Sequence, residues 1–594
     1  MIRLSDYVVK FFEKKKIDTI FQVSGGGSIF LGDALYKAKK IKYIAHHHEQ
    51  AASFAAEGYA RSKNDVGCCF VTTGPGGTNT VTGISSAWID SIPVIFIAGQ
   101  AFLNQTIKKT KKRQIGVQEI NIIDIVKPIT KFSIMITDPN SINFYLEKAY
   151  AICKSGRPGP VFIDIPADMQ NAQIDEKKIL KHTYKISKTS YSIEEKLNKI
   201  IKKLKQSKRP LIHLGHGVKL SNAKNLAKKF FNKYKIPFVV TWNADDLISS
   251  EHKMYFGKPG QFGDRGSNFI VQNCDFYLSI GTRLPYMVTG YNPKDFASKA
   301  KFKAMVDIDS HELKKNDLKI DLKITSDANY FLTKLFDKLK KYNSNSDWIS
   351  YCNNVRKKYP ILIDKMINEK KYVNSYYFVD ILSKLTKKND SIITDMGFSF
   401  TTSHQAFEIK GNQKFYTNSG HAPMGWGLCA AIGAYYAQKK SKSNIICLTG
   451  DGGFQMNIQE LATIMHNKIP MKIFIFNNGG YLTIKQTQIL GFDGRIMGAD
   501  KASGLSFPNY KAIANAHGMI YKKIINHRNL KEDVNKILQL KKTVICELIM
   551  SPNEEQIPKA VNRRDPATGK SMPAKLEDMY PFLSKDELSS NNLD

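Results

Sequence analysis

The sequence predicts an α/β protein made of three consecutive domains, each built on a doubly wound parallel β-sheet. Two observations lead to this prediction. Short apolar runs of strand length alternate with longer stretches of helical periodicity, a pattern typical of parallel sheets. In addition, 594 residues exceed what one hydrophobic core can organise, and polar stretches interrupt the alternation at 171–194 and 342–346.

The expected strands follow this alternation along the chain. In the first domain, residues 1–175, they lie at 19–23, 43–47, 67–72, 94–98 and 161–165. In the central domain, residues 190–345, they lie at 210–214, 238–241, 276–280 and 303–307. The third domain covers residues 370–550. Residues 551–594 combine prolines and charges with little periodicity, so we expect an irregular C-terminal tail.

The net charge of +35 raises the question of nucleic-acid binding. The 88 lysine and arginine residues are scattered along the whole chain, however, and no basic-aromatic RNA-binding motif is present. We therefore expect no nucleic-acid partner. No run of 18 apolar residues predicts a membrane span, and the first residues enter an amphipathic helix instead of a signal peptide. Eight irregularly spaced cysteines suit a reducing cytoplasm.

The most informative motif follows an apolar run at 444–449, which has the character of a buried strand. Gly450-Asp451-Gly452 stands at the exit of this strand, and a helical stretch at 454–467 comes next. A second apolar run, 471–476, ends on Asn477-Asn478. Because a right-handed crossover makes the two strands parallel, both exits lie at the same edge of one sheet.

This shared edge would bring oxygen ligands together. Asp451, Asn478 and a backbone carbonyl near Gly480 could hold one Mg²⁺ ion, which prefers oxygen donors. The glycines would let a phosphate approach the N-terminus of the following helix. A plain glycine-rich turn between a strand and a helix is the structural alternative.

A second constellation lies in the first domain. The strand expected at 43–47 runs into His48-Glu49-Gln50 and then into an alanine-rich segment at 51–60. Glu49 thus precedes a tightly packed apolar helix, where a carboxyl group can serve as a proton donor. A first-turn acid that only stabilises the helix is the alternative. The histidines at 46–48 would alternate faces in a strand, so we expect them to line a site instead of chelating one metal ion.

A glycine-rich loop follows the strand expected at 67–72. Its sequence, Thr73-Gly74-Pro75-Gly76-Gly77-Thr78-Asn79, would let a ligand or a neighbouring chain approach closely. Alone, this loop indicates no particular ligand.

Together these segments resemble the thiamine-diphosphate-dependent acetolactate synthase family over about residues 1–550. The 450–478 motif resembles the family's thiamine diphosphate motif, residues 48–50 its catalytic glutamate segment, and residues 73–79 its glycine-rich loop. Three further segments match family signatures: Gly156-Arg157-Pro158-Gly159-Pro160-Val161, Asp164-Ile165-Pro166, and Met424-Gly425-Trp426-Gly427-Leu428.

The resemblance implies two thiamine-diphosphate-binding folds that flank a Rossmann-like central domain. It implies a decarboxylating carboligase that takes pyruvate, a 2-oxo acid, as donor. Glu49 would be the catalytic residue against the pyrimidine ring of thiamine diphosphate, and Mg²⁺ would be held by Asp451, Asn478 and Gly480. The residues implied in binding thiamine diphosphate are Gly74, Asn79, Gly397, Met424, Gly450, Gly452, Gly453, Tyr481 and Leu482.

The resemblance also implies a homo-oligomer, a dimer at minimum. In the family, the two halves of one site come from different subunits. Glu49 and Asp451 are therefore expected to meet across a subunit interface, in a dimer or a tetramer.

Three departures from the family pattern lie near the acceptor side. Acetolactate synthases carry Phe-Gln-Glu at Val117-Gln118-Glu119, Pro-Lys-Asp at 166–168, and tryptophan at Thr487. All three replaced side chains are larger, so we expect a wider acceptor pocket. The residues expected to line it are Gly26, Val117, Gln118, Ala167 and Thr487.

The acceptor itself stays open between a second 2-oxo acid, which gives acetolactate, and a larger keto-sugar-type ketone. The segment 576–583 resembles the tail of relatives associated with surface-sugar biosynthesis. The family's Gly-Gln-His segment is also changed, to Gly397-Phe398-Ser399.

FAD is a further cofactor that the sequence leaves open. Arg157, Gly215, Gly217 and Arg283 match positions that contact flavin in family members. The family's Arg-Phe-Asp-Asp-Arg segment, however, is replaced by residues 283–287, and the Gly-x-Gly turn lacks a third glycine.

Two other functions remain as alternatives. A simple 2-oxo acid decarboxylase would protonate the donor-derived fragment instead of ligating it. A non-catalytic structural or regulatory homologue belongs to a different class, and retention of Glu49, Asp451 and Asn478 argues against it.

Overall fold

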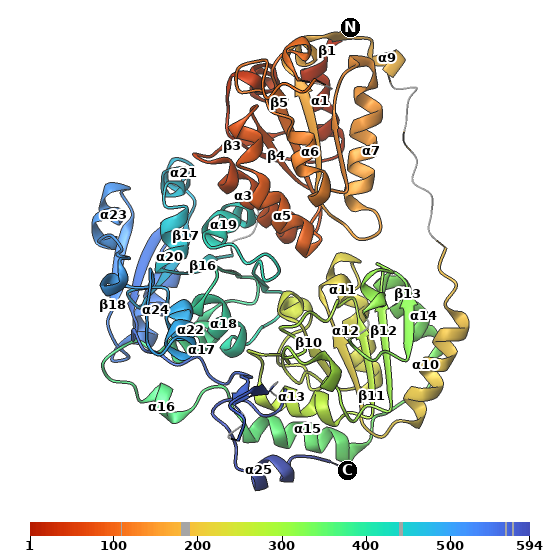
Figure 1. Cartoon of the computed structure of the whole chain (residues 1–594), viewed down its shortest axis with the longest axis vertical. Helices are drawn as coiled ribbons and strands as arrows, with labels where there is room; N and C mark the ends of the chain where they lie inside the picture. The colour runs from red at the N-terminus through yellow and green to blue at the C-terminus, as the bar shows by residue number, and fades with distance from the viewer. Residues whose placement is uncertain are drawn as a thin grey trace.

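The computed structural model describes residues 1–107, 110–179, 184, 190–315, 317–438, 443–564, 567–572 and 575–593. Within them, three α/β domains follow one another along the chain, each with a wholly parallel central sheet. In Figure 1 the first domain lies at the top, the central domain at the lower right and the third at the left. The predicted fold class is confirmed.

The first domain has a six-stranded sheet with the strand order β3-β2-β4-β5-β7-β6. Its strands are β2 (Thr19–Gln22), β3 (Lys42–Ala45), β4 (Gly67–Val71), β5 (Val94–Gln100), β6 (Phe132–Met135) and β7 (Val161–Pro166). Its helices are α1 (Leu4–Lys14), α2 (Ile29–Lys37), α3 (Glu49–Lys63), α4 (Pro75–Thr78), α5 (Val81–Asp90), α6 (Ile122–Val126), α7 (Ile142–Lys154), α8 (Ala167–Asn171) and α9 (Glu176–Ile179). The short strands β1 (Ile2–Arg3) and β8 (Gln173–Ile174) pair antiparallel beside this sheet.

The central domain has a five-stranded sheet with the order β10-β9-β11-β12-β13. Its strands are β9 (Pro210–Leu214), β10 (Phe238–Val240), β11 (Phe276–Ile280), β12 (Phe302–Asp307) and β13 (Leu322–Thr325). Its helices are α10 (Glu194–Gln206), α11 (His216–Leu220), α12 (Lys224–Tyr234), α13 (Arg265–Asn273) and α14 (Ala328–Lys338). The helices α15 (Ser346–Lys358) and α16 (Asp364–Ile367) lead to the third domain.

The third domain repeats the topology of the first, with the order β15-β14-β16-β17-β19-β18. Its strands are β14 (Ser391–Thr394), β15 (Lys414–Tyr416), β16 (Ile445–Gly450), β17 (Met471–Asn477), β18 (Ile520–Ile524) and β19 (Val544–Ile549). Its helices are α17 (Ser375–Leu385), α18 (Phe398–Ala406), α19 (Trp426–Ala437), α20 (Asp451–Met456), α21 (Glu460–His466), α22 (Leu482–Gly491), α23 (Tyr510–Ala516) and α24 (Leu530–Gln539).

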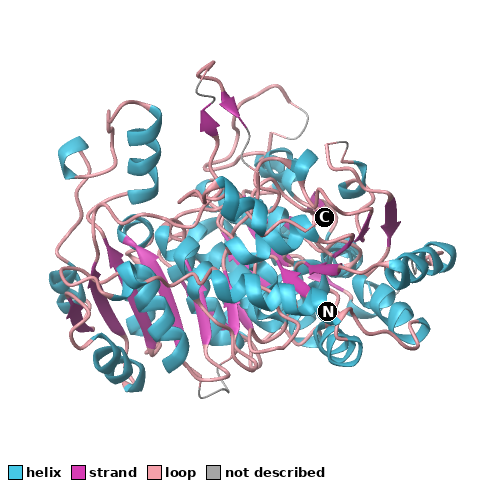
Figure 2. Ribbon diagram, turned by 90° about the horizontal axis from the view of Figure 1, so that it is seen from below, coloured by secondary structure: helices cyan, strands magenta, loops and turns pink. Residues whose placement is uncertain are grey.

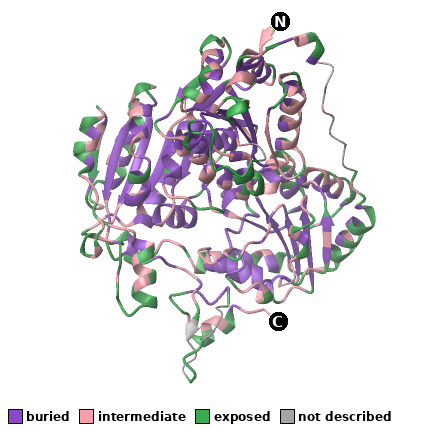
Figure 3. Cartoon of the chain, turned by 45° about the horizontal axis from the view of Figure 1, so that its top comes forward, coloured by how far each residue is buried: buried purple, intermediate pink, exposed green. Residues whose placement is uncertain are grey.

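Helices cover both faces of the sheets, as the layers in Figure 2 show. The central strands are buried along nearly their whole length, which Figure 3 displays in purple. This explains why β4, β5 and β7 are almost wholly apolar, apart from the buried Gln100 and Asp164, and lack the alternation of a half-exposed strand.

The first and third domains share one hydrophobic core, which includes residues of α3 and α19. The two helices pack closely because small residues face each other. A Cβ atom at Gly58 would overlap the backbone of Ala430, and one at Gly433 would overlap the backbone of Ala55. The alanine-rich sequence of α3 is therefore an adaptation to a helix neighbour from another domain.

The segment after β19 contains a two-stranded pair, β20 (Arg563–Arg564) and β21 (Ser571–Met572), and the helix α25 (Lys585–Ser590). It packs on the central domain. Leu576 joins a core cluster there, and the guanidinium of Arg265 donates to the carbonyls of Met579 and Pro581.

All eight cysteines are buried and unpaired. In the part of the chain that the structure describes, no helix combines the length and the apolar character needed to cross a lipid bilayer.

Candidate functional site

Glu49 is the first residue of α3, at the carboxyl end of β3. Its Oε2 accepts a hydrogen bond of 2.9 Å from Asn79 Nδ2, at the end of the glycine-rich loop. His48 caps the helix, because its Nδ1 accepts from the backbone N–H of Gln50 at 3.0 Å. The structure thus brings Glu49 and Asn79 together from segments that are 30 residues apart.

The strand expected at 43–47 extends too far, because β3 ends at Ala45 and His46 and His47 lie beyond it. The strand was predicted two residues too long; the alternation of buried and exposed residues continues through His46 and His47, although the strand has ended. His46 is buried, and its Nδ1 lies 2.8 Å from Glu460 Oε2 in α21 of the third domain. This histidine therefore joins two domains.

The glycine-rich loop begins with Gly74 at φ 60°, a conformation that favours glycine. A side chain there would also collide with the backbone of Gln118. Gln118 itself has φ 61°, and its carbonyl accepts from the Thr73 hydroxyl at 3.3 Å. The loop that carries Val117 and Gln118 is thereby fastened beside the loop that holds Asn79.

The residues expected in the acceptor pocket lie on two domains. Val117 is 87% exposed, and Gln118 and Gly26 are also exposed. Ala167 begins α8, and Thr487 lies on the exposed side of α22, with its hydroxyl bonded to the carbonyl of Thr483.

The other half of the site lies in the third domain, where Asp451 begins α20 at the exit of β16. Its Oδ2 accepts the backbone N–H groups of Asn478, Gly479 and Gly480 at 3.1, 3.0 and 3.3 Å. Its Oδ1 accepts from the Tyr510 hydroxyl at 2.7 Å. Burial raises the pKa of Asp451 to about 6, although these donors oppose the shift.

Asn478 meets Asp451 as the sequence predicted for strands with exits at one edge. Its Oδ1 is buried and has no hydrogen-bond partner. A buried amide oxygen without a donor carries a desolvation cost that a bound cation would remove. This orphaned atom beside a carboxylate fits a Mg²⁺ ligand position.

Glycines and helix N-termini surround this point. Gly397 precedes α18 at φ 81°, and a Cβ atom there would lie 3.8 Å from Thr483 Oγ1, which is buried without a partner. The helices α18, α20 and α22 all begin at the carboxyl ends of the neighbouring strands β14, β16 and β17. Their partial positive charges and unpaired N–H groups suit a diphosphate.

Met424 and Tyr481 both lie against Gly452, near the start of α20. A Cβ atom at Gly452 would overlap the ring of Tyr481 and the methyl group of Met424. One at Gly453 would overlap the carboxylate of Asp395. Leu482, which follows Tyr481 and begins α22, is buried.

Sequence reasoning missed Asp395. It follows β14 directly, and its carboxylate accepts from the Thr449 hydroxyl at 3.0 Å and from the backbone N–H of Gly425 at 3.1 Å. Burial raises its pKa to about 6. The signal that revealed Asp451, an acidic residue at the exit of an apolar run, is also present at Asp395. The helix expected at 454–467 is wrong, because it divides into α20 and α21 around Asn457.

A separate cavity of about 570 Å³ lies where the three domains meet. It contains Arg157, Gly217 and Arg283 among its lining residues, together with Asp307 at the end of β12. Gly215 precedes α11, and its backbone N–H bonds to the carbonyl of Ile280 in the adjacent strand. The positions that the sequence connected with flavin therefore gather at the carboxyl edge of the central sheet.

Comparison with known families agrees with this division into domains. Residues 2–122 match the N-terminal TPP binding domain of thiamine pyrophosphate enzymes, 197–335 the central domain, and 395–548 the C-terminal TPP binding domain. This chain is a thiamine-pyrophosphate enzyme. Each half-site described above falls within, or at the border of, one of the two TPP binding domains.

Curated relatives of this thiamine-pyrophosphate enzyme are acetolactate synthase large subunits. The chain is 32% identical over 566 residues to that of Cyanidium caldarium, with 92% of each chain covered. It is 30% identical over 561 residues to that of Lactococcus lactis subsp. lactis, with 93% of each covered. It is 33% identical over 566 residues to a probable acetolactate synthase large subunit of Methanocaldococcus jannaschii, with 93% of this chain and 92% of the relative covered.

Proposed function

We propose that this enzyme is an acetolactate synthase-like carboligase, which decarboxylates pyruvate and transfers the two-carbon unit to a carbonyl acceptor. The observation that carries the proposal is the pair of half-sites at equivalent sheet edges. One presents Glu49 bonded to Asn79, and the other presents Asp451 beside the unpartnered amide oxygen of Asn478. The names of the relatives support this activity.

Thiamine diphosphate, when bound, supplies the carbanion and the electron sink for decarboxylation and ligation. The residues of this chain would anchor and orient it. Asp451, Asn478 and the Gly480 carbonyl would hold Mg²⁺, and the N-termini of α18 and α20 would face the diphosphate. The backbones of Gly397 and Gly450 leave room for that group, whereas Gly453 lies against the carboxylate of Asp395.

Glu49 would control the proton at the pyrimidine ring. Its carboxyl group is half-buried, and the Asn79 amide fixes its orientation through Oε2. Oε1 would stay available for the ring nitrogen. Met424 would support the ring from the third domain, where it packs against Gly452.

We further propose a homodimer at minimum, with Glu49 and Asp451 of different copies in one site. Several large apolar side chains near both half-sites are exposed in the single chain and would be covered by a second copy. They include Ile29, Tyr43, Val117, Met456 and Ile484. Sedimentation of the protein, with and without thiamine diphosphate and Mg²⁺, tests this assembly. The buried, unpaired state of the cysteines supports a cytoplasmic location.

The cavity at the junction of the domains supports a nucleotide-type ligand, and FAD is the one we propose. Asp307 at a strand end could accept ribose hydroxyls, and the glycine turn at 215–217 permits close approach of a diphosphate. Arg157, however, is already paired with Asp309 and Glu312 at 3.0 and 2.9 Å. A flavin absorbance spectrum of the purified protein tests the identity of this ligand.

The acceptor pocket favours a ketone larger than pyruvate. Val117 and Thr487 are small for positions where acetolactate synthases carry phenylalanine and tryptophan. Val117→Phe should therefore lower kcat/KM for a bulky ketone acceptor by about tenfold or more relative to pyruvate. Equal losses for both acceptors would contradict this assignment.

Product analysis with labelled pyruvate tests the main proposal. Labelled acetolactate, or a labelled adduct of an added ketone, is the expected product. Labelled acetaldehyde alone would instead support a simple decarboxylase. The absence of carbon dioxide release would support a non-catalytic homologue.

A further inference from the structure

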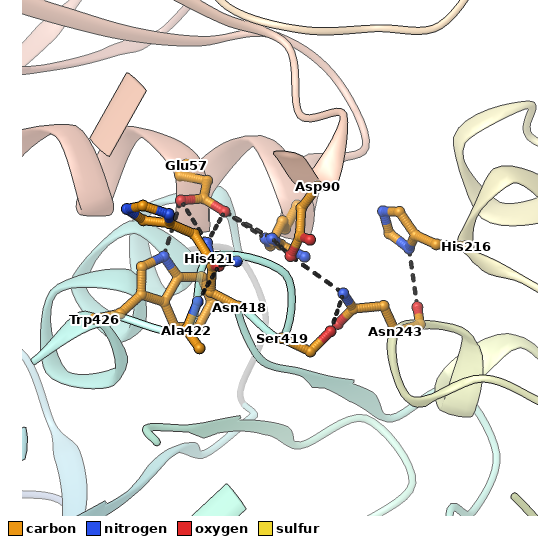
Figure 4. A network of polar contacts seen from close by, with 10 residues as sticks. Glu57, Asp90, His216, Asn243, Asn418, Ser419, His421, Ala422 and Trp426 are labelled. Atoms are coloured by element: carbon orange, nitrogen blue, oxygen red, sulfur yellow. Dashed lines mark hydrogen bonds and ion pairs between the residues drawn. The ribbon is translucent and has the colours of Figure 1, made fainter. Parts of the chain in front are cut away.

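A buried polar network lies where the three domains meet (Figure 4). Glu57 of α3 is completely buried at its centre. Arg61 Nε and Nη2 donate to Glu57 Oε1 at 2.9 and 2.7 Å, and Nη2 also donates to Asp90 Oδ2 at 2.6 Å. The helix that begins with the proposed catalytic carboxylate therefore carries a second, paired carboxylate two turns later.

Glu57 holds both ends of the loop that precedes α19. Asn418 Nδ2 donates to the Glu57 carboxylate oxygens at 3.0 and 3.3 Å, and Trp426 Nε1 donates to Oε2 at 2.9 Å. Asn418 Oδ1 accepts the backbone N–H groups of His421 and Ala422 at 3.3 and 3.4 Å. Ala422 has φ 58°, an unfavourable value for alanine that the surrounding bonds must maintain.

The same loop forms a wall of the cavity. Ser419 and Gly420 line it, together with Asp90 and Asn243. Asn243 Nδ2 donates to Asp90 Oδ2 at 3.2 Å and to Ser419 Oγ at 3.1 Å. Gly420 abuts the side chains of Asp90 and Ile89 so closely that a Cβ atom there would overlap both.

Met424 lies four residues beyond Gly420, in the same loop and before Trp426. One short segment, 418–426, thus contains both the residues that line the cavity and Met424, the proposed support of the cofactor. Glu57 holds this segment through its hydrogen bonds to Asn418 and Trp426. A polar group in such a network cannot move without leaving a buried partner unsatisfied, so its rearrangements are few and concerted. A ligand that contacts Asp90 or Ser419 would act on this whole segment.

We propose that the Glu57 network couples the cavity to the thiamine site, so that a nucleotide in the cavity changes the affinity for thiamine diphosphate. Glu57 is a positioning residue, which acts through Asn418 and Trp426 on the placement of Met424. The inference rests on the proposed function, because it assigns Met424 to the cofactor. By linkage, thiamine diphosphate changes the affinity for the nucleotide by the same factor.

Calorimetric titration of the full chain tests the coupling. Thiamine diphosphate is titrated in the presence of Mg²⁺, without a cavity probe and with saturating ADP or FAD. We expect a difference of about fivefold or more in the Kd of thiamine diphosphate for the wild type. Asn418→Ala and Trp426→Phe should reduce this difference to less than about twofold. Trp426→Phe keeps one aromatic ring in the core and removes the indole donor, but it also leaves a cavity, so Asn418→Ala is read beside it.

A matched control is Asn467→Ala. Asn467 Oδ1 accepts a hydrogen bond of 2.9 Å from the Tyr436 hydroxyl of α19. Asn467 belongs neither to the cavity lining nor to the segment 418–426. This variant should retain the full coupling. A wild-type Kd that is unchanged although a probe binds would overturn the inference, as would coupling that persists in both network variants.

Two other outcomes are also decisive. If neither ADP nor FAD binds, the coupling inference fails while the carboligase proposal stands. If thiamine diphosphate binds neither without a probe nor with saturating ADP or FAD, the proposed function itself fails, and the inference fails with it.

Discussion

The first and third domains have the same strand order but place their carboxylates in different surroundings. In the first domain α3 follows the edge strand β3, and in the third α19 follows the edge strand β15. These two helices pack against each other in the shared core. The first domain places a half-buried carboxylate, Glu49, against a single amide donor. The third places Asp451 in near-complete burial, with three backbone N–H donors on one oxygen.

This difference teaches where function lies in such a fold. The strands are alike, and the residues that differ stand at the carboxyl ends of the strands, where open α/β sheets bind ligands. A carboxylate with one amide partner can exchange a proton. A carboxylate fixed by several backbone donors is suited to hold a cation in a constant place. Four changes would break or sharpen this contrast.

The largest effect is expected for Glu49→Gln. The amide cannot exchange a proton with the pyrimidine ring, so exchange of the thiazolium C2 proton of bound thiamine diphosphate should slow by about 10²–10⁴-fold. Hydrogen–deuterium exchange followed by NMR measures this rate. Glu147→Gln, which removes a carboxylate on α7 paired with Lys15, is the control and should leave the rate unchanged. Unchanged exchange in Glu49→Gln would falsify the role given to Glu49.

Asp451→Asn should affect metal binding instead of proton exchange. The substitution removes the carboxylate that we propose as the anionic ligand, and it weakens the bonds to the backbone of residues 478–480. We expect the Mg²⁺ concentration needed for thiamine diphosphate binding to rise by about 10–100-fold, as for other lost metal-site interactions. Calorimetry at several Mg²⁺ concentrations checks this. The control is Asp380→Asn on α17, which removes only the ion pair with Lys384. This variant should bind Mg²⁺ like the wild type.

Gly433→Ala tests the packing that joins the two domains. The added methyl group would overlap the backbone of Ala55, so the free energy of unfolding should fall by about 1–3 kcal/mol, a typical overpacking cost. Chemical denaturation measures it. Gly32→Ala on α2, where a Cβ atom meets nothing within 4 Å, should not be destabilising. Equal stability of the two variants would mean that α3 and α19 can separate slightly at no cost.

The smallest effect concerns pH. Burial raises the pKa of Asp451 from 3.8 to about 6, so a proton competes with Mg²⁺ below that pH. The apparent Mg²⁺ affinity should fall by about tenfold per pH unit below pH 6 and level off above pH 7. The stability of the metal-free protein should change with pH in the opposite direction. This group stabilises the fold below about pH 4, and its contribution is lost as the pH rises through 6.

Titration of Mg²⁺ between pH 5 and 8 measures the first trend, and thermal unfolding of the metal-free protein over the same range measures the second. The Mg²⁺ affinity should rise with pH while the stability of the metal-free protein falls. A metal affinity that stays constant down to pH 5 would contradict the described burial of the carboxylate.

The fold and the meeting of Asp451 with residues 478–480 could be predicted because their signals are local. An apolar run that ends in Gly450-Asp451-Gly452, and a second that ends in Asn477-Asn478, define a strand-helix-strand unit by themselves. The exact strand ends could not be predicted, since the turn at 46–48 continues the pattern of β3. The buried histidine in that turn is explained only by Glu460, which is 414 residues away.

The sequence by itself determined the fold class, the order of the three domains, and the convergence of Asp451 with Asn478. Parallel strands with short crossovers leave no other arrangement for those residues. Only the tertiary structure decided which partners each polar group meets. Tyr510 on Asp451, Asn79 on Glu49, and the Glu57 network across three domains all join segments far apart in the chain. Burial forces such groups to pair, but their sequence positions do not specify with whom.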